Sequence, residues 1–418
     1  MALTFAAPSS LTGFRASPVL APQRRIGGSL EDGQGSSLWH VGLALGASCA
    51  LRAYGKGMGK GGYGGGGGGG GNFGGGYRSP ADIQRMTDMK RAREAEQFFQ
   101  FQRGLVQRGE RPKGEDHWTM EERRLFKTEH VSKGIDFEKY DEIQVKTRGG
   151  NGKEQPINSF QEACEKYSLP DELTANIERC GYDIPTPVQK HSIPAVLEGT
   201  DVLVTAQTGS GKTAAFLVPI ITAALQAGRK PVQEGAVCPT SVVLSPTREL
   251  CQQITNEAER LTFRSGARVA AVYGGADAIP QMRKFAAGVE VVVCTPGRLE
   301  DFLVRGVMSM EEVKFLALDE ADRMLDMGFE PQIRNIIENH GMPPAKDRQT
   351  MMFSATFPKE IQSLASDFMH TGHHSISVGR VGATTSSIEQ RFENMAYGDK
   401  MEQLLESLRK AEEGDVFA

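Results

Sequence analysis

Eight consecutive residues carry the clearest chemistry in this sequence, and they read Ala-Gln-Thr-Gly-Ser-Gly-Lys-Thr. A short β-branched run typical of a buried strand precedes them, and a segment with the composition of a helix start follows. Glycines let backbone amides approach a polyphosphate, and a helix N-terminus adds free N–H groups and a positive dipole end. This context favours a phosphate-binding loop over a chance glycine turn. The loop comprises Ala206, Gln207, Thr208, Gly209, Ser210, Gly211, Lys212 and Thr213.

Three residues of this phosphate loop define its expected chemistry. Lys212 is placed to contact the β- and γ-phosphates, and the Thr213 hydroxyl to hold Mg²⁺. Ala206 departs from the general pattern, which opens with glycine.

Two adjacent carboxylates, Asp319 and Glu320, follow another apolar run. Asp319 at a strand end can hold a metal through water, and Glu320 can orient and deprotonate an attacking water. Acidic residues are also common at helix N-termini, and an isolated acidic turn favours that interpretation. A lysine-bearing glycine loop in the same chain favours the catalytic one instead.

The elements that must position these residues alternate between apolar strand patterns and helical patterns. This alternation predicts a parallel sheet covered by helices on both faces. The predicted strands are 201–205, 241–245, 267–273, 289–294, 313–318, 349–353 and 375–378.

Six polar clusters each follow a predicted strand directly. Ligands of such domains bind at the carboxyl ends of the strands, so the six clusters are expected to share one edge. The cationic residues Arg248 and Arg298 are then expected to face an anionic partner, although each could also be a surface charge. The clusters after the phosphate loop are Pro246, Thr247 and Arg248; Gly274 and Gly275; Thr295, Pro296, Gly297 and Arg298; Asp319 to Asp322; and Ser354, Ala355 and Thr356.

The order of these motifs resembles that of DEAD-box RNA helicases. The matching segments are GYDIPTPVQ at 181–189, AQTGSGKT, PTREL, the glycine pair, TPGR, DEAD and SAT. The resemblance covers about 135–418, and the stretch from Gly134 to Gly382 is similar to the Vasa-like branch. It implies a RecA-like, P-loop NTPase fold, with ATP and Mg²⁺ as cofactors and an RNA backbone bound independently of sequence.

The resemblance also implies a role for each matching residue. Gln189 reads the adenine edge beside Tyr182 and Thr186, with Phe160 stacking on the ring, although Phe160 lies farther upstream than in the family. Catalysis falls to Lys212, Asp319 and Glu320. Nucleotide state is coupled to strand separation by Asp322, Ser354, Ala355 and Thr356. The RNA backbone is held by Pro246, Thr247, Arg248, Gly274, Gly275, Thr295, Pro296, Gly297 and Arg298.

The composition limits the nature of the nucleic-acid contact. The 418 residues carry a net charge of −4. Residues 1–80 hold seven Lys and Arg against two acids, so the remainder is acidic and any RNA contact there must be a local surface. Six cysteines without metal-ligand spacing indicate reduced core thiols, and zinc or disulfide frameworks are disfavoured.

Four regions are expected along the chain. Residues 1–80 are predicted to be disordered, with an acid-free start typical of either an organelle transit peptide or a plain tail, then a glycine-rich stretch that is either an inert tether or an RNA-gripping arm. Residues 81–154 form a charged extension that could engage protein partners. Residues 155–380 form the RecA-like domain. Residues 381–418 are expected to be a linker and the start of a truncated second domain.

These regions give a general expectation for the cellular compartment and for the oligomeric state. The family implies nucleus or cytoplasm, whereas a transit peptide in residues 1–50 would imply plastid or mitochondrion. No membrane segment is expected, since the apolar stretch at 38–53 is short and interrupted. We expect a monomer.

The arginine-rich HRxGRxGR element of the family's second lobe does not occur in the 418 residues. Because an arginine finger contributes roughly 10³ to 10⁵ to phosphoryl transfer, the chain alone is expected to bind ATP weakly and hardly hydrolyse it. Two other functions stay open: a non-catalytic RNA or partner clamp, and a DNA translocase or other P-loop ATPase.

Overall fold

A computed structural model describes residues 79–109, 113–127, 143–379, 394 and 396–413. Its centre is one eight-stranded sheet with the strand order β1-β8-β2-β7-β6-β3-β5-β4. The strands are β1 (Val145–Arg148), β2 (Val202–Thr205), β3 (Ser241–Leu244), β4 (Val269–Val272), β5 (Val291–Cys294), β6 (Phe315–Leu318), β7 (Gln349–Ser354) and β8 (His374–Val378).

Strands β2 to β8 are mutually parallel, and only β1 runs antiparallel, against β8. Strands β2, β3, β5, β6 and β7 are buried almost throughout, whereas β4 and β8 alternate buried and half-buried residues. Both patterns are visible in the sequence, and all seven strands were predicted from it. Strand β1 was not predicted, because Val-Lys-Thr-Arg is a polar edge strand with three of its four residues exposed. It lies within the segment 81–154 that was predicted to be a charged extension.

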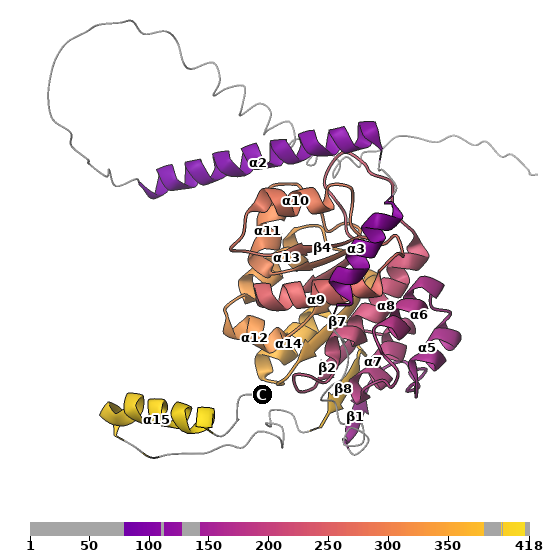
Figure 1. Cartoon of the computed structure of the whole chain (residues 1–418), viewed down its shortest axis with the longest axis vertical. Helices are drawn as coiled ribbons and strands as arrows, with labels where there is room; N and C mark the ends of the chain where they lie inside the picture. The colour runs from indigo at the N-terminus through magenta and orange to yellow at the C-terminus, as the bar shows by residue number, and fades with distance from the viewer. Residues whose placement is uncertain (1–78, 110–112, 128–142, 380–393, 395, 414–418) are drawn as a thin grey trace, which may run out of the picture. The chain divides into compact units, whose positions relative to one another are not determined.

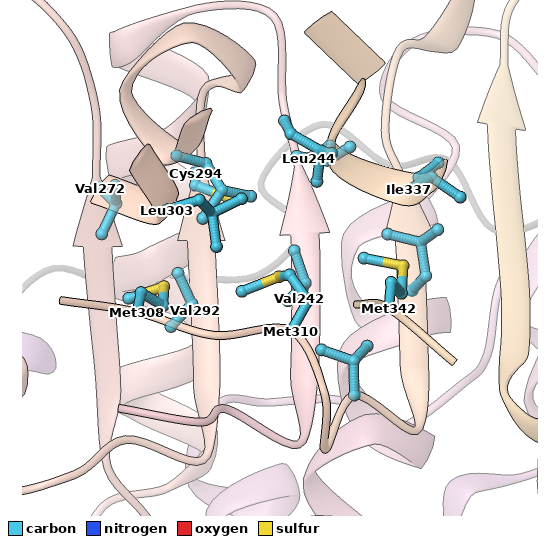
Figure 2. Close-up of a cluster of buried hydrophobic side chains, with 14 of the residues drawn as sticks. Val242, Leu244, Val272, Val292, Cys294, Leu303, Met308, Met310, Ile337 and Met342 are labelled. Atoms are coloured by element: carbon cyan, nitrogen blue, oxygen red, sulfur yellow. The ribbon is translucent and has the colours of Figure 1, made fainter. Parts of the chain in front are cut away.

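Successive residues of strands β2 to β7 contribute to two separate hydrophobic cores, one on each face of the sheet, whereas β1 and β8 contribute to only one of them. Val242 and Leu244 of β3 belong to one core, and Val243 between them belongs to the other. Figure 2 shows Val242 and Leu244 beside Val292 and Cys294 of β5. This alternation follows from the two-residue period of a strand.

Helices cover both of these faces, as Figure 1 shows, and the predicted fold class is confirmed. The core of Val242 includes residues of α2 (Pro80–Arg108), α10 (Ala278–Phe285), α11 (Pro296–Val304), α12 (Ala321–Asp326), α13 (Glu330–Asn339) and α14 (Lys359–Phe368). The core of Val243 includes residues of α5 (Phe160–Tyr167), α6 (Asp171–Arg179), α7 (Pro187–Leu197), α8 (Lys212–Ala227) and α9 (Arg248–Leu261).

Two further α-helices and two short 3-10 helices, at Ala345–Asp347 and Tyr397–Asp399, complete the described part of the chain. Helix α3 (Glu115–Leu125) contacts α9. Helix α15 (Lys400–Glu413) lies in the region predicted to begin a second domain, and its apolar residues Met401 and Leu404 are exposed. No helix of the described part is both long and apolar enough to cross a bilayer. The predicted transit peptide, the glycine-rich stretch and residues 381–393 of the predicted linker lie outside the described residues.

Candidate functional site

Six of the parallel strands are adjacent in the sheet, in the order β2-β7-β6-β3-β5-β4. Each is followed by one of the polar clusters, so the clusters line up along the carboxyl edge of the sheet. Along that edge they stand in the order phosphate loop, SAT, DEAD, PTREL, TPGR and Gly-Gly. The structure therefore brings the expected nucleotide residues to one half of the edge and the expected RNA residues to the other.

The phosphate loop connects β2 to α8 through two glycines with positive φ, Gly209 at 78° and Gly211 at 82°. Helix α8 begins at Lys212, so the first-turn N–H groups point toward the loop. Lys212 is buried, and its Nζ donates to the carbonyl oxygens of Ala206 at 3.0 Å and Gln207 at 3.3 Å. The Ser210 hydroxyl donates to the Gln207 carbonyl at 2.7 Å and so closes the turn.

Helix α7 holds the phosphate loop from one side. Its N-terminus is a capping box in which the Thr186 hydroxyl accepts from the Gln189 N–H and the Gln189 side chain accepts from the Thr186 N–H. Both side chains also reach the loop, with Thr186 Oγ1 donating to the Ser210 carbonyl at 2.7 Å and Gln189 Nε2 to the Gly211 carbonyl at 3.0 Å. A Cβ on Gly211 would lie 2.6 Å from Gln189 Nε2 and 2.9 Å from Thr186 Oγ1, so a larger residue would displace both side chains and would also strain the backbone at φ 82°.

A pocket of about 530 Å³ lies between this loop and α9. Tyr182 forms part of its wall, and the Tyr182 hydroxyl donates to Glu257 Oε1 at 2.5 Å. Burial raises the pKa of Tyr182, and the neighbouring Glu257 carboxylate raises it further, so the phenol is protonated at physiological pH. The pocket is lined by Gly181, Tyr182, Ile184, Thr186, Gln189, Gly209, Gly211, Lys212, Thr213, Ala214, Leu250, Gln253, Ile254, Glu257, Asp319 and Glu320.

Phe160 does not line this pocket. Its side chain is 2% exposed within the hydrophobic core, and its ring centroid lies 5.5 Å from that of Tyr182. Phe160 therefore supports the pocket wall from behind. Of the phosphate loop, Ala206, Gln207, Thr208 and Ser210 also lie outside the pocket lining.

The two carboxylates of the predicted catalytic pair lie at the end of β6. Asp319 is 3% exposed, and burial raises its pKa to about 6, while Lys212 opposes this shift and Glu320 adds to it. Glu320 has φ 50° and ψ 51°, the left-handed conformation that non-glycine residues rarely adopt. Such backbone strain is typical of functional sites.

The oxygen donors of Asp319 and Thr213 are of the kind that binds a magnesium ion. A carboxylate and a hydroxyl are hard oxygen ligands, and Mg²⁺ usually takes one or two such groups and completes its shell with phosphate and water. The raised pKa of Asp319 shows that Lys212 does not fully offset the burial of this carboxylate, which a cation would do. Within the described residues, no group of three acidic, His or Cys side chains could hold a metal unaided.

Asp322 connects the DEAD turn to the SAT segment after β7. Its Oδ2 accepts hydrogen bonds from the Ala355 N–H at 3.1 Å, the Thr356 N–H at 2.9 Å and the Thr356 hydroxyl at 2.8 Å. The Ala206 N–H of the phosphate loop donates to the Ser354 carbonyl at 3.0 Å. Thus SAT lies between the DEAD turn and the phosphate loop and is bonded to both.

The three clusters of the expected RNA half are also connected to one another. Arg248 is exposed, and its guanidinium lies 5.0 Å from the ring centroid of Tyr273. Next along the chain, the Gly274 N–H donates to Thr295 Oγ1 at 3.3 Å. Gly275, with φ 73°, and Gly297 are exposed, whereas Pro246, Thr295 and Pro296 are buried and Thr247 is half-buried.

Arg298 lies in a different environment from Arg248. Its side chain is 14% exposed, and its Nη2 donates to the Ala276 carbonyl at 2.8 Å. Burial lowers the pKa of Arg298, although the Asp301 carboxylate opposes this shift. Arg298 therefore fastens the start of α11 to the loop that carries Gly274 and Gly275.

Sequence reasoning missed the wall that α9 contributes to the pocket. Leu250, Gln253, Ile254 and Glu257 line it, and they recur at the three- and four-residue spacing of one helix face. That spacing was visible directly after PTREL, but it also fits an ordinary core-facing stripe. Only the position of α9 against the phosphate loop separates the two interpretations.

Residues 186–364 match the family model described as DEAD/DEAH box helicase. Among solved structures, the yeast DEAD-box splicing factor Prp28 is 30% identical with a TM-score of 0.53, and the match covers 71% of this chain and 64% of that one. The RNA helicase Prp28 from Chaetomium thermophilum bound to ADP is 30% identical, with a TM-score of 0.49 and coverage of 72% and 64%.

A DEAD box protein from the hyperthermophile Methanococcus jannaschii is 32% identical, with a TM-score of 0.46 and coverage of 60% and 64%. The present chain thus spans less than two thirds of the length of each of these three proteins. The likeness to the yeast protein confirms the RecA-like fold class.

Proposed function

We propose that this chain, whose residues 186–364 form a DEAD-box helicase family domain, is the ATP- and RNA-binding part of an ATP-dependent RNA helicase. One observation carries the proposal: six strands adjacent in the sheet deliver the six motif loops to one edge in an unbroken row. We further propose that it belongs to the Vasa-like branch and acts as a monomer, with protein partners engaged through the segment before β1.

In the nucleotide half of the edge, each residue has a role that its position supports. Lys212 would exchange its bonds to two loop carbonyls for bonds to the β- and γ-phosphates, and the Gly209 turn would bring backbone amides to the same anion. Tyr182, Thr186 and Gln189 would hold the adenine end of the pocket. Asp319 and Thr213 would hold Mg²⁺, which neutralises phosphate charge and orients the γ-phosphate.

Glu320 would orient the attacking water and accept its proton at a side-chain carboxylate oxygen. The left-handed backbone of Glu320 fixes the direction in which that carboxylate leaves the strand end. Asp322 would report the resulting change to Ser354, Ala355 and Thr356 through the three hydrogen bonds it accepts from SAT. The turn that carries Glu320 would then be connected to the reporting segment through the hydrogen bonds of Asp322 with Ala355 and Thr356.

The RNA half supplies donors that suit phosphate groups rather than bases. Arg248 offers an exposed guanidinium, and Gly275 and Gly297 offer exposed backbone. Helix α11 adds the positive end of its dipole at Pro296. Contacts of this kind position a strand without reading its sequence.

The nucleotide half is tested by replacing Lys212 in the full chain. Lys212→Ala should weaken binding of a fluorescent, non-hydrolysable ATP analogue with Mg²⁺ by about tenfold or more, because charge-assisted bonds to phosphate are lost. Fluorescence anisotropy would measure this. Lys166→Ala, at an exposed lysine outside the pocket, should bind as the wild type does. Equal affinity of the wild type and Lys212→Ala would refute the proposal.

A further inference from the structure

Four charged side chains form a largely buried cluster between α2 and α11, which we name the α2–α11 cluster: Arg91, Glu94, Asp301 and Arg305. Asp301 accepts from Arg91 Nε at 2.9 Å and pairs with Arg305 Nη2 at 2.7 Å. Arg305 also pairs with Glu94, and the side chains of both are 8% exposed. Two residues of the cluster come from α2, in the segment before β1, and two from the helicase domain.

Apolar and amide contacts hold α2 in place around this cluster. Phe98 is buried, and its ring centroid lies 5.6 Å from that of Phe285, which in turn lies 5.6 Å from that of Phe302 on α11. The buried Gln102 side chain donates to the Ala286 carbonyl at 3.3 Å and accepts from the Gly235 N–H at 2.9 Å. Helix α2 is therefore an integral part of this face of the domain.

The cluster lies one helical turn from a residue of the RNA half. Arg298 Nε is 3.9 Å from Asp301 Oδ2, and the guanidinium groups of Arg298 and Arg305 lie 5.6 and 5.8 Å from the ring centroid of Phe302. Arg298 in turn donates to the Ala276 carbonyl beside Gly275. A continuous set of contacts thus leads from α2 through Asp301 and Arg298 to the Gly-Gly loop.

We propose that α2 positions the RNA-backbone site, with Arg91 and Glu94 as positioning residues that act through Asp301 and Arg298. This inference rests on the proposed function, because it concerns how RNA is bound. Removing one member of a buried charge cluster leaves its partner without compensation, and the partner must move or recruit another group. Asp301 is shared between Arg305 at 2.7 Å and Arg298 at 3.9 Å, so a change at Arg91 or Glu94 alters how Asp301 divides its interactions between these two arginines. A resulting shift of Arg298 would release the Gly-Gly loop.

The first experiment removes a charge from the cluster in the full chain. Glu94→Gln and Arg91→Gln should each weaken binding of a fluorescent single-stranded RNA by about tenfold, with affinity for the ATP analogue unchanged within about twofold. The matched controls are Glu96→Gln and Arg103→Gln on the same helix, because that pair is 3.5 Å apart and about half exposed. Both controls should bind RNA as the wild type does.

The second experiment asks whether α2 acts through Arg298. In a double-mutant cycle, Glu94→Gln should weaken RNA binding in the wild-type background but have almost no effect when Arg298→Ala is already present. A general loss of stability would instead give additive effects. Thermal unfolding of every variant would show that the compared proteins are folded.

The outcomes distinguish a failure of the proposed function from a failure of the role of α2. If the wild-type chain binds no RNA, the proposed function fails, and the role of α2 fails with it. If the wild type binds RNA and the cycle is additive, or the cluster variants bind like their controls, only the role of α2 is refuted. A parallel loss of ATP-analogue affinity would likewise contradict it.

Discussion

Asp319 and Asp322 lie three residues apart in one turn, but their surroundings move their pKa values in opposite directions. Burial raises the pKa of Asp319 to about 6. Burial also raises the pKa of Asp322. Hydrogen bonds from Thr356 and Ser354 lower it by more than burial raises it, so the net pKa lies below its usual value. Opposite pKa shifts of this kind allow two neighbouring carboxyl groups in one site to have different protonation behaviour and different roles.

A pH dependence of stability follows for the metal-free chain. A carboxyl group with a raised pKa contributes stability that is fully present below about pH 4 and is lost as the pH rises through about 6. Asp319→Asn should therefore raise the free energy of unfolding by about 3 kcal/mol at pH 8 and by less than about 1 kcal/mol at pH 4. Urea denaturation in EDTA would measure both values.

The matched control is Asp322→Asn, which removes a well-bonded carboxylate and should lower stability at pH 8. A gain for Asp319→Asn that did not change between pH 4 and pH 8 would contradict the assignment.

At the scale of elements, α7 has two tasks, since the residues that cap it also support the phosphate loop. Thr186→Val removes the hydroxyl that accepts from the Gln189 N–H and donates to the Ser210 carbonyl. We expect a loss of about 1–2 kcal/mol in the free energy of unfolding and a clear loss of ATP-analogue affinity, measured by denaturation and by anisotropy.

Ser159→Ala is the control for this change, because Ser159 caps α5 by accepting from the Glu162 N–H at 3.0 Å and has no bond to the phosphate loop. It should lose comparable stability and keep its affinity. If both variants bind the analogue equally well, the support given by α7 is not important for binding.

The sequence predicted an element well where its buried residues are all apolar. It predicted an element less well where polar residues are buried or where the position depends on packing. Strands β2 to β6 consist mainly of valine, leucine and alanine, and β7 and β8 keep apolar residues at Met351 to Phe353 and at Ile376 and Val378. All seven could therefore be predicted from their apolar residues. Helix α2 was not separable from a solvated helix, because the buried Glu94 and Gln102 have the types expected of a surface. The position of Phe160 behind Tyr182 depends on how α5 packs, which no local pattern specifies.

At the scale of the whole molecule, the two halves of the edge are close but distinct. From β2, which precedes the phosphate loop, to β3, which precedes Arg248, there are three strand spacings, roughly 14 Å, although β6 with the DEAD turn is the direct neighbour of β3. A change in the RNA half should therefore leave nucleotide binding intact in this chain. The reverse should hold for the nucleotide half.

Arg248→Ala tests this separation. It should weaken RNA binding and reduce the slope of log K against log salt by about 0.7, the value for one phosphate contact on a single strand. ATP-analogue affinity should stay within about twofold of the wild type. Arg123→Ala, at an exposed arginine of α3, should change neither quantity; an unchanged salt slope for Arg248→Ala would exclude a phosphate contact by this side chain.

The antiparallel pairing of β1 with β8 has a consequence for biosynthesis. Arg148 pairs with Ser375 and Val145 with Val378. Among the strands that the structure describes, the first to leave the ribosome therefore waits for the last before its ladder can form. At 5–20 residues per second, that delay is roughly 10 to 45 s. Throughout it the nascent sheet lacks its closing strand, and the polar sequence Val-Lys-Thr-Arg keeps the waiting segment soluble.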